Sequence, residues 1–199
     1  MTTARMEAFS DGVFAIAITL LILDIAVPTD SADDFLRALG DQWPSYVAYF
    51  VSFATIGAVW LAHSAITEYL DRADATLIRL NLVLLLVVSF IPFPTHLLAE
   101  YHGHPDAERV AVTIYGINLL MASVLVWGLW RYSVGEHLVR PDADDEEVQV
   151  LTSRLTPSLA AYVVLIGVGI FSPLVAVLGF LTIALYLIVP VGLVRRRQG

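Results

Sequence analysis

The sequence predicts an all-α integral membrane protein that forms a single domain over residues 1–199 and crosses the bilayer six times in each subunit. Of its 199 residues, 58% are hydrophobic and only 15% are charged, whereas soluble domains carry about 25% charged residues. The apolar residues also gather in long blocks, most of them close to the ~20 residues that a membrane-spanning helix needs. A water-soluble globular protein is therefore excluded.

The charge balance is acidic, and the chain has no cysteine. Nineteen acidic residues against eleven basic ones give a formal net charge of -8, which argues against a phosphate-binding surface and against nucleic acid as a partner. The absence of cysteine excludes a disulfide framework, a thiolate nucleophile and cysteine-ligated zinc. The partner that the composition does predict is the lipid bilayer.

The apolar blocks divide the chain into six expected spans. The first block holds charged residues only near its ends, at Asp11 and Asp24. The last block is about twice the length of one span, and Ser172-Pro173 divides it into two helices because proline breaks a helix. The expected spans are residues 8–27, 45–67, 75–98, 108–131, 152–171 and 173–194.

The arginines favour six spans over a re-entrant pair or one long kinked helix in the last block. With a cytoplasmic N-terminus, nine arginines fall on the inner side and two on the outer side, which is the positive-inside bias of membrane proteins. An odd number of spans would move the three terminal arginines to the wrong face, so we expect both termini in the cytoplasm. The inner set is Arg5, Arg72, Arg79, Arg131, Arg140, Arg154 and Arg195 to Arg197, and the outer set is Arg37 and Arg109.

The first apolar segment has a competing interpretation as a cleavable signal peptide, since Arg5 precedes it and small residues follow it. Acidic Glu7 and Asp11 disfavour this interpretation, and the run is longer than the apolar core of a typical signal peptide. A membrane-spanning helix is the favoured interpretation.

A short helix is expected between the first two spans. Ser31 and Asp34 have the spacing of a capping box, and Phe35, Leu36 and Leu39 then form an apolar stripe. This stripe would lie on the membrane surface or on a neighbouring subunit.

The sequence contains no recognisable catalytic motif. It has no metalloprotease His-Glu-x-x-His, no nucleophile elbow and no phosphate-binding glycine loop. His102 and His104 flank a glycine in an outer loop but lack a third ligand, so a surface turn is favoured over a metal site. We expect a protein that is not an enzyme and that has no metal site and no cofactor.

Polar side chains inside the spans are informative because burying them in hydrocarbon requires a partner or water. Asp11, His63 and Arg79 are expected near the cytoplasmic ends of the first three spans and therefore at similar depth. Trp60 and Asn81 could join them in one hydrogen-bonded cluster. A cluster that only holds the helices together satisfies every group, and it is favoured over a proton relay.

Span one has an almost entirely apolar face. Gly12, Ile16, Thr19, Leu20 and Leu23 follow helical spacing and share one side of the helix. In a symmetric pore, these side chains would form a hydrophobic constriction that blocks ions by dewetting. From periodicity alone, contact with lipid is the favoured interpretation of this face.

The segment from Arg5 to Leu21 resembles the signature of the transmembrane protein 175 family of potassium channels. Its core is Phe9-Ser10-Asp11, preceded by arginine and followed by an apolar helix that contains threonine. The later spans match the family only in hydropathy and order. The resemblance extends to Trp60 and His63 in span two, and to Asn81-Leu82 and Pro92-Phe93-Pro94-Thr95 in span three.

The resemblance implies a passive potassium channel in the plasma (inner) membrane of a prokaryote. Family members with one repeat have six helices and assemble as homotetramers around a pore lined by the first helix, without a filter loop. On this basis Ile16 becomes the constriction of an apolar gate, Leu20 and Leu23 become further rings, and Thr19 becomes the residue linked to potassium preference. The implied structural polar network is Arg5, Ser10, Asp11, Trp60 and His63, with Asn81 as a less certain member.

Two other classes of function stay open. A proton-coupled secondary transporter could use Asp11 and His63, but it would need a midplane site, usually marked by broken helices. The first four spans show no such break near their centres, apart from the proline pair late in span three. A membrane scaffold without transport would instead bury the apolar face of span one against another protein.

Overall fold

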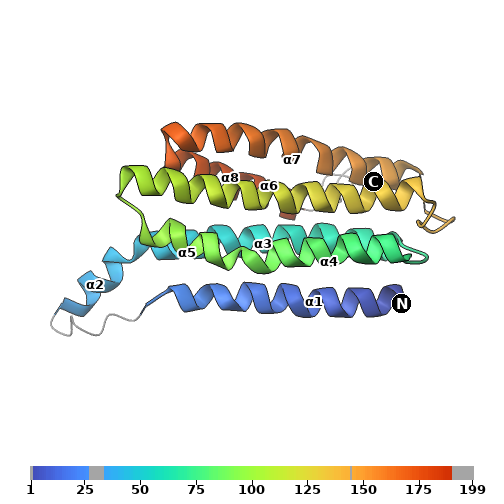
Figure 1. Cartoon of the computed structure of the whole chain (residues 1–199), viewed down its shortest axis with the longest axis horizontal. Helices are drawn as coiled ribbons and strands as arrows, with labels where there is room; N and C mark the ends of the chain where they lie inside the picture. The colour runs from blue at the N-terminus through green and yellow to red at the C-terminus, as the bar shows by residue number, and fades with distance from the viewer. Residues whose placement is uncertain (1, 27–33, 144, 190–199) are drawn as a thin grey trace, which may run out of the picture.

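The apolar blocks of the sequence form helices that lie side by side along one long axis (Figure 1). They are seen in a computed structural model that describes residues 2–26, 34–143 and 145–189. The all-α class predicted from composition is therefore confirmed. The elements are α1 (Thr3–Leu20), the 3-10 helix η1 (Leu21–Asp24), α2 (Phe35–Asp41), α3 (Trp43–Tyr69), α4 (Ala75–Phe90), α5 (Pro92–Glu100), α6 (Pro105–Gly135), α7 (Asp145–Phe171) and α8 (Pro173–Ile188).

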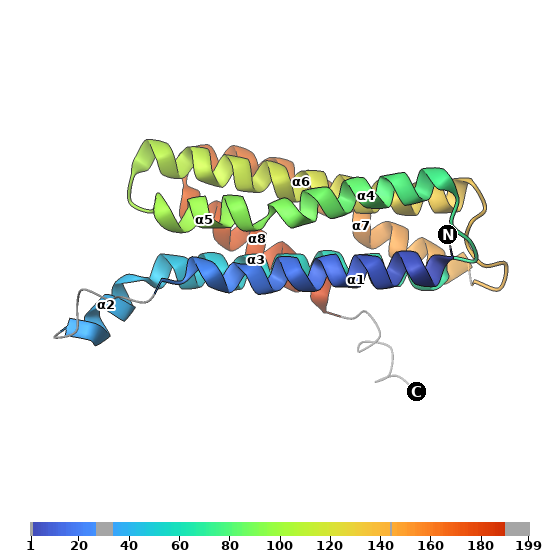
Figure 2. The same ribbon diagram turned by 60° about the horizontal axis from the view of Figure 1, so that its bottom comes forward.

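Helices α3 and α6 form the middle of the bundle. Helix α1 packs against α3 and α4 on one flank (Figure 2), while α7 and α8 pack against α6 and α3 on the opposite flank (Figure 1). The N-terminus lies at one end of the bundle, here called the N-terminal end, and α2 lies at the other, here called the α2 end (Figure 1). Helix α1 is therefore an edge element with one broad uncovered side.

Five helical segments among the described residues are long and apolar enough to cross a membrane. The C-terminal helix α8 is shorter, with 16 residues, or ~24 Å at 1.5 Å per residue, against a hydrocarbon core of ~30 Å. The sixth span thus remains a prediction. The five candidate spans are Thr3–Asp24, Trp43–Tyr69, Ala75–Glu100, Pro105–Gly135 and Val148–Phe171.

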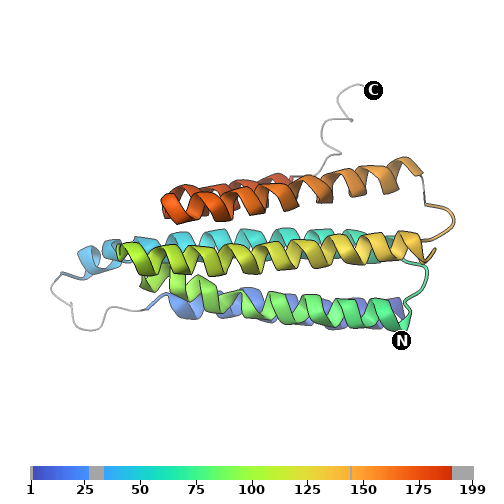
Figure 3. The same cartoon turned by 45° about the horizontal axis from the view of Figure 1, so that its top comes forward.

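Prolines mark the two breaks within the apolar blocks. Helix α4 ends at Phe90, and α5 begins at Pro92, because prolines at the start of α5 provide no N–H groups to continue the α4 ladder. Helix α7 ends just before Ser172, and α8 begins at Pro173. The two final helices pack against each other along their lengths (Figure 3).

Glycines allow α7 to approach its neighbours closely. A Cβ atom on Gly116 of α6 would lie 2.7 Å from Ile166 of α7, and one on Gly179 of α8 would clash with Leu165 of α7. Small residues at such contacts are typical of helix packing in membranes, where tight van der Waals contact replaces the hydrophobic driving force. These two positions therefore fix α7 onto α6 and α8.

The short helix expected between the first two spans is present as α2, but its start differs from the expected one. The helix begins at Phe35, so Asp34 is its N-cap residue, and the Asp34 side chain makes no capping hydrogen bond. Ser31 lies outside the described residues. Helix α2 buries none of its side chains, and Phe35 and Leu36 are 43% and 84% exposed, so the bundle leaves most of the apolar stripe uncovered.

Two loops are tied together at the N-terminal end. Leu70 and Val139 form an isolated antiparallel bridge. Nearby, Asp74 caps α4 by accepting a hydrogen bond from the Leu77 amide at 2.7 Å, and it accepts a second from the Tyr132 hydroxyl at 2.6 Å. These two hydrogen bonds stabilise the ionised carboxylate and lower the pKa of Asp74 from its ordinary value.

Candidate functional site

The predicted pore face of α1 is the side of the helix that the bundle leaves uncovered. Ile16 is 60% exposed, Leu20 is 44% exposed and Leu23 is 74% exposed. Gly12 and Thr19 are exposed as well. All five predicted residues of this face therefore lie together on one accessible surface of the subunit. The buried side of the same helix consists of Met6, Ser10, Phe14 and Ala17.

Thr19 is the one polar side chain of this face between Gly12 and Leu23. Its Oγ1 lies 2.9 Å from the Ala15 carbonyl oxygen and 3.0 Å from that of Ile16, so the hydroxyl hydrogen is donated within the helix. A threonine oxygen also has acceptor lone pairs. Because that hydrogen is already engaged, Thr19 presents oxygen lone pairs toward the exposed side, where they can receive a cation or a water molecule.

Phe9 belongs to the same face and was missed from the sequence. It is 55% exposed, and it precedes Ile16 by seven residues, which is two helical turns. The helical spacing that selected Gly12, Ile16 and Leu23 includes position 9, so extending the pattern by one step would have found it. The apolar face therefore begins within the Phe9-Ser10-Asp11 motif itself.

A buried chain of hydrogen bonds joins α1, α3 and α4. His63 Nε2 lies 2.8 Å from Asn81 Oδ1, and Asn81 Nδ2 donates to Ser10 Oγ at 2.9 Å. The Ser10 hydroxyl in turn donates to the Met6 carbonyl oxygen at 2.8 Å. His63, Asn81 and Ser10 are all at least 98% buried. Three helices are thus tied together by three predicted network residues.

The direction of this chain fixes the protonation of the imidazole. An amide oxygen only accepts hydrogen bonds, so the nitrogen that faces Asn81 Oδ1, His63 Nε2, must carry the hydrogen. The other ring nitrogen, Nδ1, is buried and has no hydrogen-bond partner among the described residues. The chain ends on the backbone carbonyl of Met6, as expected of a structural network.

Asp11 and Trp60 form a separate pair. The Trp60 indole N–H donates to Asp11 Oδ1 at 2.8 Å, and Trp60 is 37% exposed. The Phe14 ring packs beside the His63 ring, with centroids 5.5 Å apart. The expected single cluster is therefore divided into a buried chain and a half-exposed pair, because neighbouring residues of α1 face different directions.

The two predicted arginines do not join these groups. Arg5 and Arg79 are exposed, and neither side chain makes a hydrogen bond or ion pair with the described residues. His102, in the loop between α5 and α6, instead pairs with Glu108 at 2.9 Å. Within the described ranges, no group of three or more His, Cys, Asp or Glu side chains is placed to hold a metal ion.

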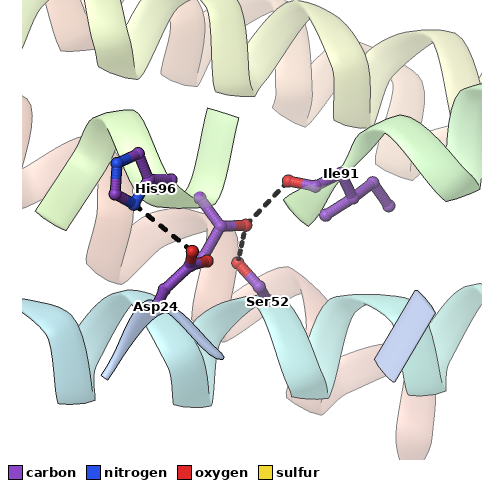
Figure 4. A network of polar contacts seen from close by, with 5 residues as sticks. Asp24, Ser52, Ile91 and His96 are labelled. Carbon is purple, nitrogen blue, oxygen red and sulfur yellow. Dashed lines mark hydrogen bonds and ion pairs between the residues drawn. The ribbon is translucent and has the colours of Figure 1, made fainter. Parts of the chain in front are cut away.

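A second set of polar contacts lies toward the α2 end and was not assembled from the sequence. Ser52 Oγ lies 2.7 Å from Thr95 Oγ1 and 3.0 Å from the Tyr115 hydroxyl. The residue after Thr95 is His96, and its Nδ1 lies 3.3 Å from Asp24 Oδ1 (Figure 4). The sequence does not predict these contacts, because they depend on how η1 and α6 pack against α3 and α5.

Together, the long apolar helices and their internal polar ties define a multi-span helical membrane protein. Residues 5–92 match the family described as endosomal/lysosomal potassium channel TMEM175. A potassium channel of Streptomyces collinus is 40% identical over 186 residues, which cover 92% of this chain and 90% of that protein. The chain belongs to the TMEM175 family of ion channels, and the resemblance carried by its N-terminal motif is confirmed.

Two further relatives bear on function. A crystal structure of a lysosomal potassium-selective channel TMEM175 homolog from Chamaesiphon minutus superposes with a TM-score of 0.84 at 37% identity, covering 93% of this chain and 95% of that chain. The endosomal/lysosomal proton channel TMEM175 of Homo sapiens is 33% identical over 139 residues, 65% of this chain and 28% of that protein. The family is therefore one of ion channels rather than enzymes, and its bacterial relatives are named for potassium.

Proposed function

We propose that the protein is a passive, potassium-selective channel in which four copies place α1 around a common axis. The observation that carries this proposal is the uncovered face of α1, where Ile16, Leu20 and Leu23 are exposed while the polar network lies on other sides of the helix. Four copies related by symmetry can enclose a path on their axis. Six helices of one subunit leave little room for such a path.

The apolar rings act as the gate. Ile16, Leu20 and Leu23 are about one turn apart, so four copies would form stacked constrictions that exclude water until the helices separate. Dehydration at these rings penalises the more strongly hydrated sodium ion. The free lone pairs of Thr19 return part of the lost coordination to potassium. Phe9 adds an apolar ring toward the N-terminal end.

The polar network positions the pore helix. Ser10 attaches α1 to α4 through Asn81, which in turn contacts His63 of α3. Asp11 attaches α1 to α3 through Trp60. These bonds fix the rotation of α1 about its axis and so fix the direction in which its exposed face points. This role needs no change of protonation. Because the Arg5 side chain is exposed in the described subunit, it would join the proposed network only by contacting another copy.

The proposed membrane topology has six spans, with α8 as the last. Both termini lie in the cytoplasm of a prokaryotic cell, because that orientation places nine arginines on the inner side and two on the outer side. The N-terminal end of the bundle is then the cytoplasmic end, and the α2 end faces outward. The chain is a multi-pass protein of the plasma membrane.

Potassium flux into liposomes tests the proposal. Purified protein should pass potassium down an imposed gradient, faster than sodium and faster than empty vesicles. Flux no greater than that of empty vesicles at every voltage and pH would contradict it. A folded, correctly sized protein in detergent is the control that separates an inactive channel from a denatured sample.

A proton-coupled secondary transporter that uses Asp11 and His63 is the second candidate. The observation in its favour is the buried His63 Nδ1, which has no partner among the described residues and could accept a proton. The vertebrate relatives named as proton channels also point to proton movement in the family. Saturable flux that requires a proton gradient would support this candidate over a passive channel.

A further inference from the structure

An apolar groove lies between α4 and α6, which pack side by side (Figure 2). Its volume is about 430 Å³, which is within the range of pockets that hold small molecules. The residues that line it include Leu86, Val87 and Phe90 of α4 and Ile114, Asn118 and Met121 of α6. Leu86, Phe90 and Met121 are exposed, so the groove is open to the surroundings of the subunit.

The groove lies near the middle of two candidate membrane spans. The span Ala75–Glu100 has its midpoint close to Val87, and the span Pro105–Gly135 has its midpoint close to Leu120. The hydrocarbon core of a bilayer contains no water to satisfy exposed polar groups, and acyl chains carry no hydrogen-bond donor. A polar atom in this groove therefore needs a partner from the protein or from a molecule dissolved in the membrane.

Asn118 is the one polar side chain among the residues that line the groove, and it is only 5% exposed. Its Nδ2 donates to the Val87 carbonyl oxygen at 3.2 Å. Because a carbonyl oxygen only accepts, this contact requires the amino group of the amide to face α4, and Oδ1 is its other end. Asn118 Oδ1 is buried and has no hydrogen-bond partner among the described residues. The groove therefore contains an acceptor that needs a donor.

The lining of the groove defines the chemistry of its occupant. An aliphatic amine would bring a positive charge into the membrane interior, which is costly, so a neutral hydroxyl is the better donor for Asn118 Oδ1. Phe90 offers an aromatic ring and Met121 a polarizable sulfur, and both make favourable contacts with an aromatic ring. The exposed Met121 side chain is unbranched, so it can turn aside and admit the hydroxyl. A phenol meets all of these requirements.

We propose that the groove between α4 and α6 is a binding site for uncharged, membrane-soluble phenols. The phenol hydroxyl donates to Asn118 Oδ1, and the ring lies against Phe90 and Met121. Acyl chains can fill the same volume, but they cannot donate, so the hydroxyl decides which molecule is preferred. The groove belongs to α4 and α6, whereas the proposed pore face belongs to α1 and η1, so the site requires neither conduction nor four copies.

Nuclear magnetic resonance of labelled methionine methyl groups tests the proposal on the full chain in lipid nanodiscs. Met121 reports from the groove, and Met6, buried on α1, is the internal control. The probes are para-tert-butylphenol and para-tert-butylanisole, in which a methyl ether replaces the hydroxyl. The phenol should shift the Met121 signal saturably, with about fivefold higher affinity than the anisole. That ratio is expected of one hydrogen bond worth ~1 kcal/mol.

Three variants sharpen the test. Asn118→Leu removes the acceptor, so the phenol and the anisole should bind with equal affinity. Leu86→Trp fills the groove and should weaken the binding of both probes about tenfold. Leu82→Trp lies one turn earlier on α4, outside the groove lining, and should bind as the wild type does. Leu82 and Leu86 are both exposed, so these two variants keep the test decisive even if Asn118→Leu does not fold.

Four results would overturn the proposal. They are equal affinities for the two probes in the wild type, a preference for the phenol that persists in Asn118→Leu, a shift that never saturates, and a Met121 signal that neither probe moves. The last result is expected if a neighbouring copy or tightly held lipid covers the groove. Ion flux plays no part in any of these measurements, so they separate failure of this site from failure of the proposed channel.

Discussion

The two faces of α1 differ in whether their side chains have partners within the subunit. The buried face carries Ser10, whose hydrogen bonds are completed by Asn81 and Met6 within the subunit. The exposed face carries Ile16 and Leu23, which have no comparable packing partners in the subunit and are 60% and 74% exposed. The contacts of the first face are complete when one chain folds. The second face is covered only when lipid or another copy packs against it.

This difference separates stability from conduction along a single helix. Changes on the buried face should alter folding and assembly, because they leave buried polar groups without partners. Changes on the exposed face should alter ion flow with little effect on the fold of the subunit.

Asn81→Leu should give the largest loss of stability. It leaves the His63 Nε2–H without an acceptor and removes a donor to Ser10, for a cost of about 2 kcal/mol in a membrane interior. Thermal unfolding in detergent measures this loss. Ser89→Ala is the matched control on α4, since Ser89 is exposed and bonds only to its own helix. An equal shift in both variants would show that the network does not hold the helices.

Ile16→Asn should raise potassium conductance about tenfold, which corresponds to ~1.4 kcal/mol less barrier. An amide at the constriction retains water, and the apolar gate no longer dewets. Single-channel recording or liposome flux measures the change. Ile22→Asn is the control, because Ile22 is 51% exposed but lies in η1, outside the helical spacing that places Ile16 and Leu23 on one face. Equal currents in the wild type and Ile16→Asn, with both proteins folded, would remove Ile16 from the gate.

Thr19→Val should lower the preference for potassium over sodium by about threefold, or ~0.7 kcal/mol. Valine keeps the shape of threonine but removes the oxygen, and the lost hydroxyl bonds only within its own helix. Reversal potentials in mixed salt measure the selectivity, and the melting temperature should stay the same. Thr182→Val is a control, since Thr182 makes the same local bond on α8. Unaltered selectivity in Thr19→Val would exclude a role for this oxygen.

Asp74→Asn should have the smallest effect, and that effect should depend on pH. In the folded protein the pKa of Asp74 is lowered from its ordinary value of 3.8, so its ionised form adds stability above that value. This stability is lost as pH falls through the lower folded pKa. Melting temperatures of the two proteins should differ most at neutral pH and converge below pH 3.8. A difference that grows with acidification would contradict this assignment.

Hydropathy and proline placement were enough to predict the class of fold. The long apolar blocks became helices, and Pro92 and Pro173 mark where two of those blocks break. The start of α2 could not be placed, because Asp34 makes no capping hydrogen bond and the apolar stripe is unpacked. Packing in three dimensions, rather than the local signal, decides such a boundary.

The site was predicted unevenly, for a physical reason. Residues on one helix, such as Ile16 and Leu23, share a face by spacing alone, and the structure places them together. Contacts between helices depend on rotation about each axis, which hydropathy does not give. For that reason Arg79, expected in the polar cluster, is exposed, whereas the Asp24–His96 contact was not foreseen.

Electron microscopy of the detergent-purified oligomer tests the central claim most directly, because it counts the subunits and shows what lies on their axis. The account predicts four copies, with Ile16 of each α1 and Leu23 of each η1 facing a central path. A map in which acyl chains cover this face, or in which the protein is a monomer, would contradict the account. The polar network would then hold together a membrane protein whose α1 plays no part in conduction.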